Sequence, residues 1–114
     1  MKNLQAIALG ITGIALAVVP MSANSAPNAD LLQEAAGFRA QTECSIDRFG
    51  YNNQQVALKV SLWTGNDPDR VAAYRHRDTQ KMAAMIRPAF NNDCTAMDFD
   101  NPSLQRALQY GSRL

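Results

Sequence analysis

The N-terminal segment most constrains what the rest of this chain can fold into, because it has the features of a cleaved export signal. Lys2 supplies a positive start, an uncharged and mostly apolar run covers residues 7–19, and small residues occupy 22–26. This order is typical of a secretory signal peptide. We therefore predict that residues 1–25 are removed and that residues 26–114 form one exported domain.

An uncleaved membrane anchor is the alternative interpretation of the same segment. Spanning a bilayer takes about 20 consecutive apolar residues, whereas the apolar stretch from Leu4 to Val19 has only 16 and includes polar side chains. The small residues favour a cut after Ser25, with Ala23 as the second option. No later segment is comparably apolar, so we expect no stable membrane span after cleavage.

Export would deliver Cys44 and Cys94 to an oxidising compartment, where cysteines can pair. The two cysteines lie 50 positions apart, and the chain has one histidine and no Cys-x-x-Cys motif. This inventory argues against a Cys/His metal site and against thioredoxin-like redox chemistry. The remaining prediction is one structural disulfide, Cys44–Cys94, worth on the order of 4 kcal/mol for a loop of that size.

The predicted mature domain is small and electrically balanced. A chain of 89 residues has room for one hydrophobic core. Without Lys2, ten Lys and Arg face ten Asp and Glu, so the net charge is zero with His76 neutral. This balance argues against a nucleic-acid partner, which requires a concentrated excess of cations. It argues equally against electrostatic attachment to an anionic membrane surface.

Most of the mature chain has helical signals. Apolar residues at three- and four-residue intervals predict a helix over 28–49, ended by Gly50. Segment 54–64 is ambiguous, because Val56, Leu58, Val60 and Leu62 alternate as in a strand whereas Val56, Val60 and Trp63 also share a helical face. The flanking Asn and Gly residues favour a helix.

Two pairs of residues, Asp67-Pro68 and Asn101-Pro102, predict further helix starts, because each joins a capping side chain to a proline at the first helical position. The helix from Pro68 should carry Val71, Ala72 and Tyr74 inward. The polar run 75–81 leaves two options open. Either one long helix has a solvated middle, or the chain breaks near Arg77 and restarts with Asp78 or Thr79 as the cap.

We therefore predict an all-α fold, a small bundle of four to five helices with the disulfide Cys44–Cys94. Pro88 should kink or end the helix that carries Met82, Met85 and Ile86. A turn-rich loop should then hold Cys94, and Gly111 should close the last helix. The methionines fit core packing, although an adaptable binding groove is their functional alternative.

Few side chains suggest a reaction. His76, as the only histidine, is either a catalytic base or a surface residue, and we favour the surface because no nucleophile accompanies it. Asp93, Asp98 and Asp100 form an oxygen-rich loop that lacks the calcium-binding EF-hand pattern. Ordinary Asx turns explain those residues better. We therefore expect no catalytic residue, no metal and no cofactor.

One basic concentration is a candidate site for partner binding: Arg70, Arg75, Arg77 and Lys81. The functional interpretation is a docking face for an acidic partner. The alternative is a solvated helix with local ion pairs, because Asp67, Asp69 and Asp78 are interspersed among the cations.

In outline the chain resembles the small periplasmic acid-stress chaperones, which combine a signal peptide, a short helical domain and two cysteines about fifty residues apart. The first functional expectation is an exported, non-catalytic binding or accessory protein of a bacterial-type cell envelope. It would be periplasmic or secreted and would act on another envelope or secreted protein. The alternative, which the resemblance implies, is a holdase activated by acid or stress. Acidification would bring the mature net charge to about +11, and self-repulsion could loosen so small a domain.

Overall fold

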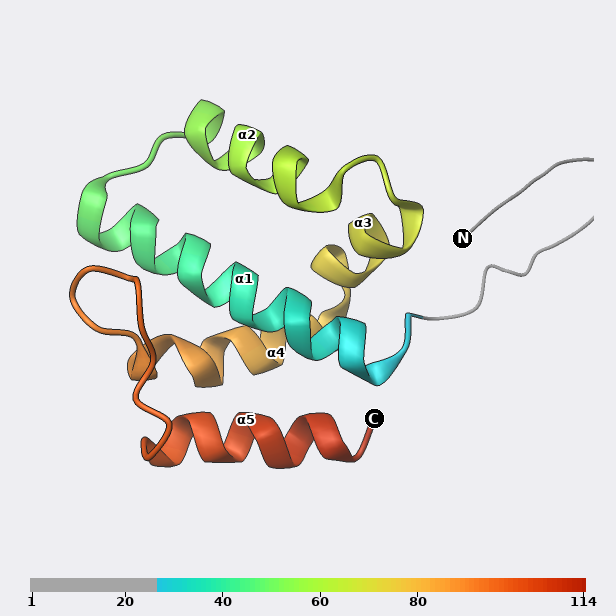
Figure 1. The fold of residues 1–114 in the computed structure, drawn as a ribbon, viewed down its shortest axis with the longest axis vertical. Coiled ribbons are helices and arrows are strands. Elements are labelled where there is room, and N and C mark those ends of the chain that lie inside the picture. Colours follow the sequence, from blue (N-terminus) through green and yellow to red (C-terminus); the bar gives the residue numbers. More distant parts are fainter. Residues whose placement is uncertain (1–26) are drawn as a thin grey trace, which may run out of the picture.

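The computed structural model describes residues 27–114, which form an all-α bundle (Figure 1). Its helices are α1 (Ala29–Phe49), α2 (Asn53–Thr64), α3 (Pro68–Arg75), α4 (Arg77–Ile86), the short 3₁₀ helix η2 (Arg87–Ala89) and α5 (Pro102–Ser112). The predicted fold class is confirmed. The predicted signal peptide lies outside the described residues. Among the helices of residues 27–114, none combines the length and hydropathy that crossing a membrane requires.

Helix α1 runs through the middle of the bundle, with α2 on one side and α4 and α5 on the other (Figure 1). The core lies between α1, α4 and α5 and is rich in alanine, which allows close approach of the helices. Its buried residues are Leu32, Ala35, Ala36, Ala40, Ala73, Met82, Ala83, Ile86, Ala89, Leu104 and Ala107. Met85 and Met97 pack against this core, so the core-packing interpretation of the methionines is confirmed.

The predicted disulfide is confirmed. It joins Cys44, near the end of α1, to Cys94 in the loop before α5. Both cysteines are buried, and the Gln41 side chain donates a hydrogen bond of 3.0 Å to the Cys94 carbonyl. Cys94 has a φ of +59°, a left-handed conformation that costs energy for a residue with a Cβ. The disulfide and the Gln41 bond therefore hold this strained residue in place.

The ends of α1 and α2 follow the capping signals in the sequence. Asn28 caps α1, and Asn52 and Gln55 form a capping box at the start of α2. Gly50 and Gly65 end the two helices at φ of +66° and +55°, where glycine avoids the steric cost of a Cβ. The favoured helical interpretation of segment 54–64 is therefore confirmed.

The chain breaks between α3 and α4 at His76, which decides between the two options for the polar run. The His76 ring nitrogen Nδ1 accepts a hydrogen bond of 3.0 Å from the Asp78 amide. His76 is thus the cap of α4, and the predicted caps, Asp78 and Thr79, were wrong. Thr79 does not cap α4, because its buried hydroxyl donates back to the Ala73 carbonyl at 2.6 Å.

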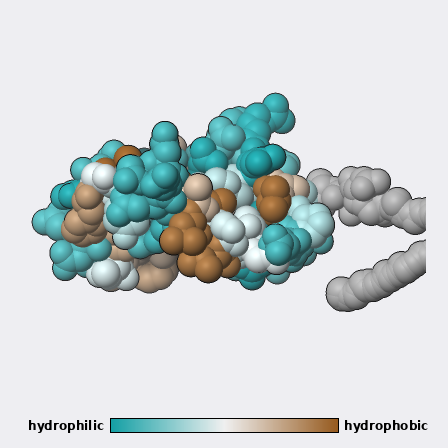
Figure 2. All heavy atoms as spheres, turned by 90° about the horizontal axis from the view of Figure 1, so that it is seen from above, coloured by the Kyte–Doolittle hydropathy of each residue, from teal (hydrophilic) through white to brown (hydrophobic). Residues whose placement is uncertain are grey.

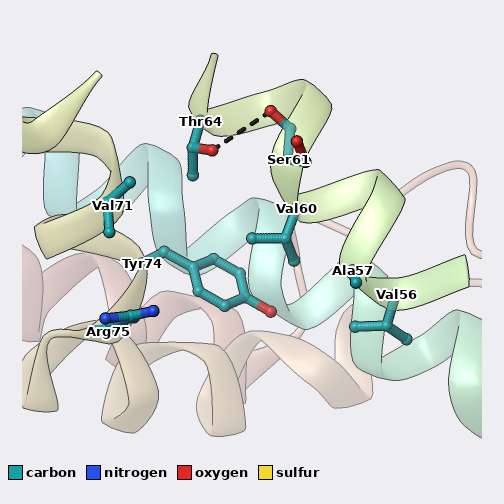
Figure 3. A pocket seen from close by; sticks show the side chains of 8 residues that line it. All are labelled: Val56, Ala57, Val60, Ser61, Thr64, Val71, Tyr74 and Arg75. Carbon is teal, nitrogen blue, oxygen red and sulfur yellow. Dashed lines mark hydrogen bonds between the residues drawn. The ribbon is translucent and has the colours of Figure 1, made fainter. Parts of the chain in front are cut away.

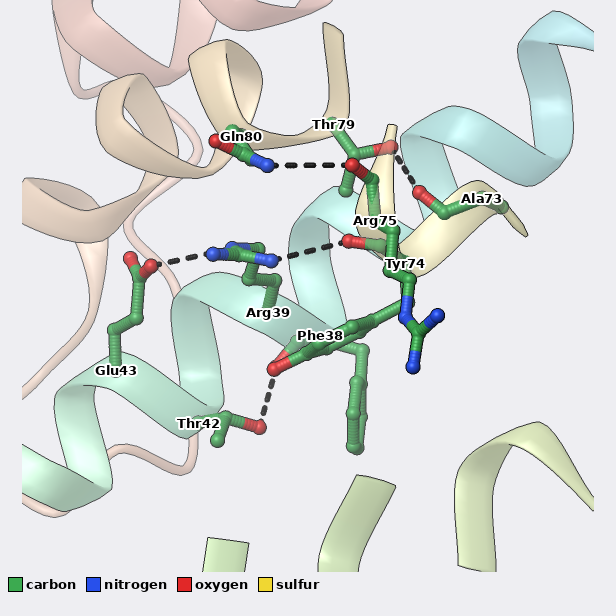
Figure 4. Close-up of polar contacts among 9 residues, drawn as sticks. All are labelled: Phe38, Arg39, Thr42, Glu43, Ala73, Tyr74, Arg75, Thr79 and Gln80. Atoms are coloured by element: carbon green, nitrogen blue, oxygen red, sulfur yellow. Dashed lines mark hydrogen bonds and ion pairs between the residues drawn. The ribbon is translucent and has the colours of Figure 1, made fainter. Parts of the chain in front are cut away.

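Side chains from the polar run and from α1 satisfy the carbonyls that the end of α3 leaves free (Figure 4). Besides the Thr79 bond to Ala73, Arg39 donates to the Tyr74 carbonyl at 3.1 Å. Gln80 donates to the Arg75 carbonyl at 3.2 Å. The polar run therefore fixes the corner between the two helices.

Three further predictions concern the ends and faces of α3, α4 and α5. Helix α4 ends at Ile86, directly before η2 and its Pro88, as predicted. Helix α3 buries Ala73, whereas Ala72 is exposed, so the expected inward position of Ala72 was wrong. Helix α5 begins at Pro102 as predicted but continues past Gly111 to Ser112. Gly111 instead allows a close approach to α1, because a Cβ there would lie 2.8 Å from the Gln33 side chain.

Candidate functional site: the two faces of helix α2

Helix α2 is the least buried helix of the described fold. Of its 12 residues only Thr64 is buried, and Lys59 is its single charged residue. A surface helix of a globular domain normally pairs one apolar stripe with a charged opposite face. Helix α2 lacks that charged face, so most of its surface is neither buried by the fold nor strongly solvated.

Three aromatic rings attach the inner face of α2 to the rest of the domain. Trp63 from α2 stacks on Phe38 from α1, with centroids 5.0 Å apart and an interplanar angle of 11°. Tyr74 from α3 meets Phe38 edge-on at 5.9 Å. Such pairs add about 0.5–1.5 kcal/mol each beyond the area they bury. This aromatic cluster, Phe38, Trp63 and Tyr74, is the main attachment of α2.

Cations cover the aromatic cluster from outside. Arg70 lies over Trp63 at 4.7 Å, Arg39 over Tyr74 at 5.0 Å and Lys59 over Phe38 at 5.6 Å. Each contact of this kind contributes about 0.5–1 kcal/mol where water has access. Part of the cluster's stabilisation therefore comes from side chains that remain partly in solvent.

Arg70, one of the predicted partner-binding residues, has internal contacts. Its guanidinium donates to the Trp63 carbonyl at 3.0 Å and pairs with Glu34 on α1 at 3.2 Å. Together with its position over the Trp63 ring, these contacts link α3 to both α1 and α2. In this structure Arg70 clamps three helices together.

A groove of about 410 Å³ separates α2 from α3 (Figure 3). Its walls are mostly aliphatic, and its lining residues are Val56, Ala57, Val60, Ser61, Thr64, Val71, Tyr74 and Arg75. The Tyr74 ring projects into this space (Figure 3). Burial raises the pKa of Tyr74 above its ordinary value of 10.0; nearby Arg39 lowers it in part, and Glu43 raises it further. The groove is therefore apolar along most of its length.

The outer face of α2 exposes two leucines one helical turn apart. Leu58 is 63% exposed and Leu62 is 75% exposed. Both line a second, shallower hollow of about 310 Å³, together with Tyr51, Gln55 and Lys59. Figure 2, which views the molecule from the α2 side, shows hydrophobic side chains gathered in the middle of this face between hydrophilic ones. We call Tyr51, Leu58 and Leu62 the outer stripe.

The alternating pattern of segment 54–64 contained the signal for this arrangement, although none of the predicted site residues lies on α2. A two-residue period places apolar side chains on both sides of a helix. Val56, Val60 and Trp63 face the domain and are half-buried, which leaves Leu58 and Leu62 outside. A pattern that fits neither a strand nor a one-sided helix therefore indicated a helix with two apolar faces.

The three remaining predicted partner-binding residues are exposed but do not share one surface. Arg75 lines the groove beside α2. Arg77 lies on the α5 side, near Tyr110: the hydrogen bond to Asp78 raises the pKa of Tyr110, and nearby Arg77 lowers it by less. Lys81 follows one turn after Arg77 on α4. The four cations therefore divide between an internal clamp, the groove and the α4 surface.

The oxygen-rich loop before α5 is organised by turns. The Asn91 side chain accepts from the amides of Thr95 and Ala96, and Asp98 accepts from the Asp100 amide at 3.0 Å. The prediction of Asx turns is thus confirmed. Within residues 27–114, no three Asp, Glu, His or Cys side chains gather in a way that would hold a metal ion.

Comparison of the chain with protein-family models, with curated protein sequences and with solved structures gave no match. The geometry of α2 and its surroundings is therefore what points to a function.

Proposed function

We propose that this chain is an exported, non-catalytic binding protein of a bacterial-type cell envelope and that the outer stripe of α2 docks onto another envelope or secreted protein. The observation that carries the proposal is the exposure of Leu58 and Leu62 on a helix with a single charge. Isolated exposed leucines are common on protein surfaces. Two leucines that border a hollow beside Tyr51 instead form a continuous apolar patch, as binding sites do.

The spacing of the two leucines fits docking of α2 into an apolar groove of the partner. Leu58 and Leu62 lie four positions apart on one side of α2, and Tyr51, which precedes the helix, lines the same hollow. Amphipathic helices that bind in grooves use anchors at this spacing. The shallow hollow offers an apolar side chain of the partner a place between the leucines. Lys59, at the same hollow, favours an acidic residue at the partner's rim.

Export and the absence of catalysis are parts of the same proposal. A disulfide that is buried at both cysteines suits a small domain in an oxidising compartment. The only histidine uses Nδ1 to cap α4, and the two cysteine sulfurs are joined to each other. Because these side chains already have partners, they support the non-catalytic part of the proposal.

Site-directed photo-crosslinking tests the docking proposal. A photoreactive residue at Leu62 should give one discrete crosslinked product in envelope extracts at neutral pH. The same residue at Leu108, which is 44% exposed on α5, is the matched control and should give none. Equal products from both positions, or none from Leu62, would contradict the proposal. Mass spectrometry of the purified chain should find a new N-terminus near Ala26, and an intact Met1 would contradict export.

An acid-activated holdase is the second candidate, and the position of the disulfide favours it. Cys44 and Cys94 lie on α1 and on the loop before α5, so the disulfide does not cross-link α2 itself to the rest of the domain. Charge repulsion at low pH could then release α2 while the disulfide limits further expansion. This function predicts suppression of client aggregation at low pH and none at neutral pH. An unchanged fold in acid, or no suppression, would contradict it.

A further inference from the structure

The groove between α2 and α3 has the size of a small-molecule site and lies on the opposite side of α2 from the outer stripe. Its volume of about 410 Å³ falls within the roughly 300–1,000 Å³ of such sites. Val56 and Val60 line it from α2 and Val71 from α3. The Tyr74 ring lies between Val71 at one end and Val56 at the other (Figure 3).

The floor of the groove is held in place before any ligand arrives. The Tyr74 ring meets Phe38 edge-on and lies 5.0 Å from the Arg39 guanidinium. Arg39 also fixes the Tyr74 backbone through a hydrogen bond to its carbonyl. On the α2 wall, the Thr64 hydroxyl donates to the Ser61 carbonyl at 3.3 Å. That side chain already has a partner, so the α2 wall offers a ligand mainly aliphatic contact.

Arg75 is the single charged residue that lines the groove. It lies at the same end of the groove as Val71, away from Val56 (Figure 3). Arg39, Arg70 and Arg87 each pair with a carboxylate, whereas Arg75 has no ion-pair partner among residues 27–114. An aliphatic groove with one unpaired cation at its end complements a ligand with one negative charge and an apolar body.

We propose that this groove binds an aliphatic monocarboxylate, that is, a fatty acid, with its carboxylate on Arg75 and its chain along Val71, Val60 and Val56. The single cation matches one negative charge. The aliphatic lining residues match an alkyl chain, and the few polar groups of the lining would leave many hydroxyls of a sugar or amides of a peptide unpaired. The Tyr74 ring supports the middle of the chain.

The only tryptophan of the chain provides the signal for a test. Trp63 lies 6.5 Å from Tyr74 in the aromatic cluster, so occupation of the groove should change its fluorescence. The purified, disulfide-bonded chain is titrated at neutral pH with decanoate, decanol and decylamine, each below the concentration at which it self-associates. We expect a saturable response of one site to decanoate, a weaker one to decanol and the weakest to decylamine.

Matched arginine variants separate a charge-specific site from general adsorption of an alkyl chain. Arg75→Gln should weaken decanoate binding by about tenfold and leave decanol binding unchanged, because only the carboxylate contacts the guanidinium. Arg77→Gln, two positions away and outside the groove lining, should bind decanoate as the parent chain does. Ala57→Phe, at an exposed position that lines the groove, should abolish the response by filling the space.

Several results would overturn the proposal. The first is a decanoate response that does not saturate, or no response at all. The second is equal binding of decanoate and decanol. The third is an equal effect of the Arg75→Gln and Arg77→Gln substitutions. Unimpaired binding to the Ala57→Phe variant would also contradict a site within this groove.

Discussion

The Trp63 indole stacks on the Phe38 ring with centroids 5.0 Å apart and planes only 11° from parallel, and this contact attaches α2 to α1. The disulfide attaches a different pair of segments, the end of α1 and the loop before α5. Core and disulfide therefore stabilise α1, α4 and α5, whereas α2 depends on aromatic and cation–π contacts. This division explains how a small stable domain can present one helix with two accessible apolar faces.

Removing the stack should release α2 without unfolding the core. Trp63→Ala should lower the free energy of unfolding by about 2 kcal/mol, less than for a fully buried tryptophan because Trp63 is half-buried. Amide hydrogen exchange should accelerate in α2 far more than in α4. Trp63→Phe keeps a ring against Phe38 and should restore most of the protection. Equal acceleration in both helices after Trp63→Ala would show that α2 is not separately attached.

Histidine 76 should behave as a helix cap in stability measurements. His76→Ala removes the acceptor for the Asp78 amide and should cost about 1 kcal/mol. His76→Asn supplies another acceptor at the same position and should retain most of the parent stability. Chemical denaturation of both variants distinguishes them, and equal losses would exclude the capping role.

The raised pKa of Tyr74 predicts a loss of stability in alkali. Burial keeps the Tyr74 hydroxyl protonated to a higher pH in the folded chain than in the unfolded chain, whose tyrosines titrate near 10.0. Its contribution is therefore complete below about pH 10 and is lost as pH rises through the folded pKa. Tyr74→Phe should flatten the decline of stability above pH 10. An unchanged decline in the Tyr74→Phe variant would contradict this assignment.

Gly111 should show energetic coupling to Gln33 across the α1–α5 contact. A Cβ at position 111 would lie 2.8 Å from the Gln33 side chain, so Gly111→Ala requires that side chain to move. In a Gln33→Ala background the same substitution should instead stabilise the helix, by up to about 1 kcal/mol. A double-mutant cycle by thermal denaturation measures the coupling, and strictly additive effects would contradict the close approach.

The disulfide should supply a large share of the net stability. Replacing Cys44 and Cys94 by serine frees a loop of 50 residues and should cost about 4 kcal/mol on the chain-entropy model. The loss should appear as a lower denaturation midpoint of the whole domain. A loss restricted to the loop before α5, with an unchanged midpoint, would contradict that prediction.

Local signals made much of the fold predictable, whereas features that depend on contacts between distant segments could not be predicted. Asp67-Pro68 and Asn101-Pro102 marked helix starts correctly because a cap and a proline act within one turn. The cap at His76 was missed because it depends on the tertiary corner between α3 and α4. There the Thr79 hydroxyl bonds the Ala73 carbonyl, and the imidazole accepts from the Asp78 amide. Gly111 was misread as a terminator, because its role arises from a contact with a residue on α1.

The candidate sites were less predictable for the same physical reason. The sequence grouped Arg70, Arg75, Arg77 and Lys81 by proximity along the chain, whereas the break at His76 turns Arg75 and Arg77 toward different helices. The groove depends on the spacing between α2 and α3, which no local pattern specifies. The exposure of Leu62 depends on which face of a two-faced helix the domain covers.

The affinity of the crosslinked partner, once purified, tests the central claim about α2 most directly. Calorimetry would compare the parent chain with two double variants, Leu58→Gln/Leu62→Gln and Phe99→Gln/Leu108→Gln. All four substituted residues are exposed. The first variant should bind about a hundredfold more weakly or worse, because it loses two leucine contacts that the partner would bury. The second variant should bind as the parent does. Equal affinities of the two double variants would contradict a docking role for α2.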